Sequence, residues 1–231
     1  MSRRMPLLIL VAGFIVNQSL LADDLEVDCA MYAKAESASL VPGQEAAFAQ
    51  AVAEFLKPGR NIISYGGYVD ENGKLSHAVA SINSKSSPRK LGRLRAVVEE
   101  LDFRPAALDG AHLLVYLTLM AVIDKRENGS IGITMFNNHG PLFDDFGADD
   151  VSPQRVGLFG GQPLLFNAVA IAGQVSVDGR LRDVEILKRI DATIPQVQYL
   201  ENRLTSLCYV PGKSDGSPRE MTYYEVFERV Q

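Results

Sequence analysis

Few residues in this chain have the types and spacing that catalysis or metal binding requires. The histidines stand at positions 77, 112 and 139, and the separations between them match no local metal-binding motif. A histidine metal site would therefore need residues that come together only in the folded chain. His77 and His112 are expected at the surface. No serine, cysteine or carboxylate pair has the context of a nucleophile or an acid–base pair. The sequence therefore predicts a non-catalytic protein without cofactor or metal.

An acidic stretch is the best candidate for binding a cation. Asp144, Asp145, Asp149 and Asp150 lie close together beside Gly147. Clustered carboxylates suit a hard cation such as calcium, but the spacing is not that of an EF-hand. A solvated acidic loop is therefore the favoured interpretation. A hydrolase or metal-dependent enzyme built on these central residues stays an alternative.

The two cysteines, Cys29 and Cys208, leave two interpretations open. In an exported protein they are compatible with one disulfide closing a very long loop. Alternatively, Cys208 is an inert buried thiol, since it follows the apolar Leu207.

The first residues predict export. Arg3 and Arg4 precede an apolar run over 5–16, and a short polar stretch separates this run from Ala22. The pattern indicates a signal peptide over residues 1–22, because the apolar run is too short for a confident membrane span. An uncleaved anchor is the alternative. Cleavage would leave no integral membrane span. It would also change the formal net charge from −5 to −7, and this negative charge implies no nucleic-acid partner.

A segment of about 57 residues occurs twice, with the second copy 106 positions after the first. Conservative replacements at the same offset are Lys74 with Arg180 and Phe103 with Tyr209. Glycines, prolines and periodic apolar residues are what two copies of one folding unit would retain. The nine identities at this offset are Gly67/Gly173, Val69/Val175, Gly73/Gly179, Leu75/Leu181, Leu94/Leu200, Leu101/Leu207, Pro105/Pro211, Asp109/Asp215 and Gly110/Gly216.

Each copy is expected to form two strands, a helix and a closing strand. In the first copy, residues 65–69 and 75–82 predict a hairpin, and Ser87 with Pro88 predicts the start of a helix. Thr193 and Pro195 predict the matching helix start in the second copy. The closing strands are expected over 113–123 and 220–230, after turns at Asp109-Gly110 and Asp215-Gly216. Antiparallel sheets, each covered by one helix, would bury both apolar stripes, which is an α+β fold.

Three segments outside the copies have readable patterns. Residues 44–56 predict an alanine-rich helix that packs Phe48, Val52, Phe55 and Leu56 on the first sheet. Residues 130–136 and 164–171 predict strands, and 137–156 predicts a loop. The expected division is a signal peptide (1–22), a first domain with its helical extension (23–125) and a second domain with an acidic leading insertion (126–231).

The repeated pattern resembles the C-terminal domain of TonB, the periplasmic energy-coupling protein. The residues that carry the resemblance are Gly73-Lys74-Leu75, Phe103-Arg104-Pro105-Ala106 and Gly110, with a weaker match over Gly179-Arg180-Leu181, Tyr209, Pro211 and Gly216. Two tandem copies would cover about half of the chain. The chain lacks a proline-rich spacer, so the expected activity is binding in the periplasm rather than energy transduction.

The resemblance implies binding by strand addition, in which an extended segment of a partner protein joins a sheet edge. In that family the last strand lies near the edge, so the closing strands are the expected sites. The partner would be a segment of an envelope protein, and a self-associating envelope scaffold is the alternative. The expected binding residues are Tyr116, Leu117, Tyr223, Tyr224 and Val226.

Overall fold

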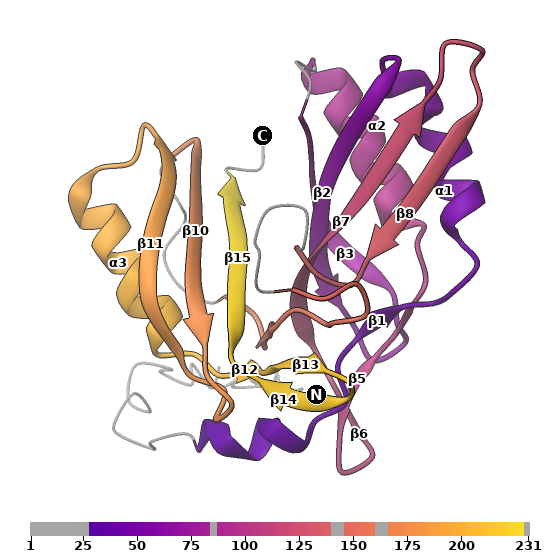
Figure 1. Ribbon diagram of the computed structural model, residues 1–231. Helices are drawn as coiled ribbons and strands as arrows, with labels where there is room; N and C mark the ends of the chain where they lie inside the picture. Colours follow the sequence, from indigo (N-terminus) through magenta and orange to yellow (C-terminus); the bar gives the residue numbers. More distant parts are fainter. Residues whose placement is uncertain (1–27, 84–86, 140–145, 160–165, 229–231) are drawn as a thin grey trace, which may run out of the picture.

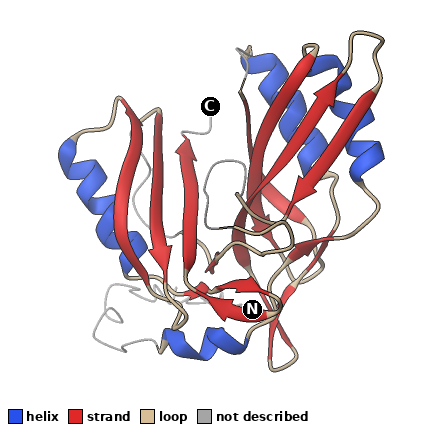
Figure 2. Cartoon of the chain, in the orientation of Figure 1, coloured by secondary structure: helices blue, strands red, loops and turns tan. Residues whose placement is uncertain are grey.

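The computed structural model describes residues 28–83, 87–139, 146–159 and 166–228. The chain has a mixed α+β fold in which all paired strands of the described ranges run antiparallel (Figures 1 and 2). The expected signal peptide, Asp144 and Asp145 lie outside these ranges. In the ranges above, no helix is long and apolar enough to cross a membrane.

The first copy builds most of a six-stranded sheet together with two covering helices. In chain order its elements are η1 (Cys29–Lys34), β1 (Ser39–Leu40), α1 (Glu45–Val52), η2 (Ala53–Phe55), β2 (Gly59–Val69), β3 (Leu75–Ile82), α2 (Pro88–Glu99), β4 (Phe103–Arg104), β5 (Ala106–Leu108), β6 (Ala111–Leu113), β7 (Val115–Lys125) and β8 (Ile131–Phe136). Strand β2 lies between β3 and β7. On its other side, β7 pairs with β8 and with the short strand β9 (Gln154–Val156).

The second copy follows the first at the same offset. Its elements are β10 (Ala168–Val175), β11 (Leu181–Ile190), α3 (Ile194–Thr205), β12 (Tyr209–Val210), β13 (Gly212–Ser214), β14 (Ser217–Arg219) and β15 (Met221–Glu228). The helix and the four strands that follow it begin 106 residues after their counterparts α2, β4, β5, β6 and β7. Pro105 and Pro211 both stand between a pair of short strands, so the repeated sequence corresponds to a repeated topology.

Two glycines show why the copies keep the same sequence at this point. Gly73 and Gly179 have φ of 74° and 72°, which is strained for other residues. A Cβ on Gly73 would lie 1.9 Å from the carbonyl oxygen of Phe103, and one on Gly179 would lie 2.5 Å from that of Tyr209. In both copies the hairpin turn therefore presses against the residue that follows the helix, where only glycine fits.

The helix of each copy buries one apolar face against its sheet. Helix α2 begins at Ser87, whose hydroxyl accepts from the Lys90 amide, and α3 begins at Thr193, whose amide donates to Gln196. Leu94 of α2 and Leu200 of α3, one repeat apart, are buried in separate apolar cores. The larger core also takes in α1.

The copies are joined by a strand that sequence analysis did not anticipate. Strand β9 pairs with β7 of the first copy and with β12 of the second. Strand β9 pairs with β12 in the same way as β1 pairs with β4 in the first copy. Arg155 lies opposite Tyr209, and Leu40 lies opposite Phe103. Each copy thus includes a short leading strand. Equivalent residues of the two leading strands are 115 residues apart in sequence, rather than the 106 residues of the repeat.

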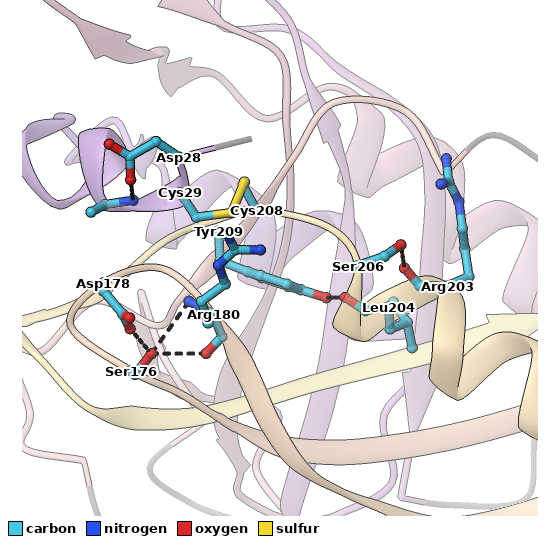
Figure 3. Close-up of a disulfide and its surroundings, with 11 residues drawn as sticks. Asp28, Cys29, Ser176, Asp178, Arg180, Arg203, Leu204, Ser206, Cys208 and Tyr209 are labelled. Carbon is cyan, nitrogen blue, oxygen red and sulfur yellow. Dashed lines mark hydrogen bonds between the residues drawn. A yellow bond between two sulfur atoms is a disulfide. The ribbon is translucent and has the colours of Figure 1, made fainter. Parts of the chain in front are cut away.

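A disulfide between Cys29 and Cys208 ties the N-terminal segment to the second copy (Figure 3). The Cα atoms lie 5.1 Å apart, and the cysteines are 179 residues apart in sequence. Cys208 lies three residues beyond the end of α3 and precedes Tyr209, whose hydroxyl donates to the Leu204 carbonyl at 3.0 Å. Of the two interpretations that the sequence left open, the bonded one is the structure of the chain.

Most of the expected elements are present with shifted bounds. The expected helix over 44–56 is α1 followed by η2, with Phe48, Val52, Phe55 and Leu56 all buried. The strand expected over 130–136 is β8. The expected loop over 137–156 contains β9, and the strand expected over 164–171 is β10, which begins at Ala168.

Candidate binding edges

The predicted binding residues of the first copy do not lie at a sheet edge. Tyr116 and Leu117 belong to β7, which has β2 on one side and β8 and β9 on the other. Both side chains are buried. The expectation that the first closing strand is an edge is wrong, because the chain continues beyond it and adds strands on its outer side.

The second closing strand, β15, pairs only with β10 in the described ranges. Its other side faces the first sheet, where the Thr118 hydroxyl donates to the Tyr224 carbonyl. Tyr223 is buried against α3 in the core of the second copy. Val226 lines a small cavity together with Thr118 and residues of β2 and β3. Tyr224 and Val226 therefore lie between the two copies, whereas Tyr223 belongs to the core of the second copy.

A buried ion pair connects β9 to β15. The Arg155 guanidinium donates to the Glu225 carboxylate at 2.8 and 3.2 Å, and the two side chains are only 1% and 2% exposed. Arg155 also lies over the rings of Tyr68, Tyr116 and Phe159. Burial opposes the charge on Arg155, but Glu225 together with Tyr223 and Tyr68 outweighs burial and raises the pKa of the guanidinium. Both side chains of this ion pair are almost completely shielded from solvent.

The histidines and aspartates singled out by the sequence form no metal site in the described residues. His77 and His112 are exposed, as expected, whereas His139 is buried and its Nε2 lies 2.8 Å from the Thr118 hydroxyl. The Asp150 carboxylate accepts from the Gly147 amide at 2.7 Å. Within the ranges that the structure describes, no three histidine, cysteine, aspartate or glutamate side chains are grouped to hold a metal.

Three further long strands, β3, β8 and β11, have a side without a strand partner in the described residues. Two of them carry features that prevent strand pairing. In β3, the outer amide of Ala78 donates to the Glu99 carboxylate of α2 at 3.3 Å. His77 has a φ of 52° and accompanies an irregularity in the β2–β3 register. The β3 edge is therefore covered by a side chain and bent by a bulge.

Strand β11 is protected by charge and irregularity. Five of its ten residues are charged, and its pairing with β10 shifts register twice. Asp183 has a φ of 50° at one of these shifts. Charged side chains and bulges are the usual means by which proteins keep an edge from pairing with another strand.

Strand β8 has none of these protections. Residues 130–136 contain no charged residue and no proline, and β8 pairs with β7 in one continuous register. The neighbouring turn fixes which groups face outward. The Arg126 amide donates to the Ser130 carbonyl at 2.8 Å, across a three-residue loop that ends in Gly129 with a φ of 84°.

Bonded and non-bonded residue pairs alternate along an antiparallel ladder. Arg126 and Ser130 form a bonded pair, so by alternation the backbone groups of Gly132 and Thr134 bond to β7. The N–H and C=O groups of Ile131, Ile133 and Met135 therefore point away from β7. Within the described residues no strand pairs with them.

A groove runs beside this edge, between β8 and α1. Its volume is about 570 Å³, and its walls are Ala46, Ala49 and Ala53 on the helical side and Ile131 and Ile133 on the strand. Figure 1 places α1 and β8 next to each other on the side of the molecule away from the second copy. The side chains of Ile131, Ile133 and Met135 pack partly against the core of the first copy, so only their backbone groups are left for an added strand.

No known relative identifies this arrangement. The chain matches no protein-family model, no curated protein and no solved structure. Sequence analysis missed the β8 edge, although an uncharged strand after a Glu-Asn-Gly turn was visible at 127–136. The sequence does not indicate that this strand pairs with β7.

Proposed function

We propose that this chain is a non-catalytic protein of the periplasm that captures an extended segment of an envelope protein by strand addition. The observation that carries the proposal is the outer edge of β8, where Ile131, Ile133 and Met135 present backbone groups on a regular, uncharged strand. An unprotected edge of this kind is a template for another strand and an aggregation hazard. Among β3, β8 and β11, the outer edge of β8 is the one that the described residues leave open to a further strand.

Export rests on two observations. The N-terminal pattern over residues 1–22 is that of a signal peptide. The disulfide between Cys29 and Cys208 supports the same location, because disulfides persist in oxidising compartments.

The proposed relation to TonB rests on the repeated order of elements. Each copy has two strands, a helix, short strands and a longer closing strand. We therefore propose two tandem TonB C-terminal-like units. The proposed site is β8 rather than the closing strands, since Tyr116, Leu117 and Tyr223 are buried and the other predicted residues of β15 lie between the copies.

The test is a selection of short random peptides on the folded chain, followed by N-methylation of the best binder at each position in turn. Strand addition uses every second amide of the ligand. Binding should therefore be lost at alternate positions only, and a proline scan should give the same alternation. A binder that tolerates N-methylation throughout, or a selection that yields no binder, would contradict strand addition.

Self-association is the second candidate, and exposed apolar side chains of the second copy favour it. Leu187 and Ile190 of β11 are 44% and 40% exposed, and Ile194 of α3 is 61% exposed. The position equivalent to Leu187 in the first copy is Ser81, so the apolar character belongs to the second copy alone.

Sedimentation of the purified chain across a range of concentrations tests this candidate. If these side chains form an interface, the chain should sediment as an oligomer, and Ile194→Lys should return it to a monomer. A chain that is monomeric at all concentrations contradicts the scaffold.

A further inference from the structure

We infer that the groove between β8 and α1 is the ligand site, and that it takes an extended, uncharged segment with apolar side chains at every second residue. This inference rests on the proposed strand-addition function and specifies its site and its ligand. A strand added to β8 would continue the β7–β8 sheet in its existing register. Helix α1 already packs against β8, so the added strand would lie beside β8 with one face toward α1.

The depth of the groove comes from the residues of α1. Ala46 and Ala49 of α1 and Ala53 of η2 recur at helical spacing on the side that faces β8. Larger side chains at these positions would close the space that Ile131 and Ile133 leave open. Phe48 and Val52, on another face of α1, are buried in the core and hold the helix at this distance from the strand.

The lining determines the chemistry of the ligand. Side chains alternate between the two faces of a strand, so one half of the ligand side chains would enter the groove and the other half would face water. Among its lining residues Glu45 carries the one charge, and the others are alanine, isoleucine, glycine and Gln50. Away from Glu45, a charged side chain in this space would lose hydration without gaining a partner. The ligand is therefore a polypeptide segment that alternates apolar and polar residues.

Two defined peptides test this inference on the full chain. The apolar probe alternates valine and threonine over six residues between terminal lysines, and the polar probe replaces each valine by serine. The apolar probe should bind at least about tenfold more tightly, because each valine removes apolar surface from water. Equal affinity of the two probes would overturn the inferred ligand chemistry.

Two neighbouring alanines provide a matched pair of variants. Ala46 and Ala47 are both exposed on α1, but Ala46 lines this groove and Ala47 lines the opposite side of the helix, toward α2. Ala46→Phe should fill the groove and weaken the apolar probe by about tenfold or more, which is about 1.4 kcal/mol. Ala47→Phe carries the same cost in helix propensity and should leave the affinity within about twofold.

The outcomes of these experiments distinguish a failure of the inferred site from a failure of the proposed strand-addition function. If the apolar probe binds and Ala46→Phe has no effect beyond that of Ala47→Phe, the groove is not the site, although strand addition elsewhere survives. If the chain binds neither probe at about 1 mM while selected peptides still bind with alternating N-methyl sensitivity, the inferred ligand chemistry is wrong. If no peptide of any kind binds, strand addition itself fails, and the groove fails with it.

Discussion

Thr118 donates a hydrogen bond to the carbonyl of Tyr224, the residue that occupies its own position in the second copy. The two closing strands therefore meet at equivalent residues. An edge that would be available in an isolated unit is used here to hold the copies together. Because both closing strands are occupied in this way, the proposed partner strand would join another edge of the molecule.

The buried ion pair predicts a specific pattern of stability. Arg155 and Glu225 replace Leu40 and Leu119, which stand at the equivalent positions of the first copy and are buried. Removing one charge leaves the other buried without its partner, so Arg155→Leu or Glu225→Leu should each lower the free energy of unfolding by about 3–5 kcal/mol.

The double variant, Arg155→Leu with Glu225→Leu, should be less destabilised than either single variant, since neither charge is then buried alone. Urea denaturation of the three variants measures this. A double variant that loses the sum of the two single losses would show that the pair is not coupled.

Three buried tyrosines predict unfolding in alkali. Burial raises the pKa of Tyr65, Tyr209 and Tyr223, and nearby carboxylates raise it further. A tyrosine whose pKa is higher in the folded than in the unfolded chain stabilises the fold below about pH 10, and this contribution is lost as pH rises further. Each tyrosine should lower the unfolding free energy by up to about 1.4 kcal/mol per pH unit above that point.

Tyr65→Phe is the matched control for this prediction. The Tyr65 hydroxyl is buried without a hydrogen-bond partner in the described residues, so its removal should cost little at neutral pH. The variant should show a smaller loss of stability in alkali. Tyrosinate absorbance from these residues should appear only as the chain unfolds, and its appearance in the folded protein would contradict their burial.

The disulfide predicts a strong dependence of stability on redox conditions. Cys29 and Cys208 close a loop of 179 residues, which by the chain-entropy argument contributes up to about 5 kcal/mol. The double variant Cys29→Ser with Cys208→Ser should unfold at lower urea concentration than the oxidised protein. Reductant should bring the wild-type chain to the same midpoint as the variant, and an unchanged midpoint in both experiments would exclude the bond in solution.

The repeat was readable from the sequence because it is fixed by local chemistry. Gly73 and Gly179 need positive φ, and Leu94 and Leu200 need helical spacing, so residue types alone predict the turns and helices. Both helices begin at the residues that the capping pattern indicated. The fold class and most of the elements of each copy follow from signals of this kind.

The binding edge could not be read in the same way, because it depends on pairing between distant segments. Nothing local indicates that residues 154–156 join β7 to β12, or that β8 covers the outer side of β7. Arg155 and Glu225 are 70 residues apart, and neither belongs to a recognisable motif. The closing strands were expected at an edge for lack of this long-range information.

Amide hydrogen exchange along β8, measured by NMR with and without the valine–threonine peptide, tests the central claim most directly. In the free chain, the amides of Ile131, Ile133 and Met135 should exchange rapidly, while those of Gly132 and Thr134, bonded to β7, should be protected. Addition of the peptide should protect the three outward amides and leave the other two unchanged. Binding that leaves all three outward amides exchanging at their free rates would contradict strand addition at β8.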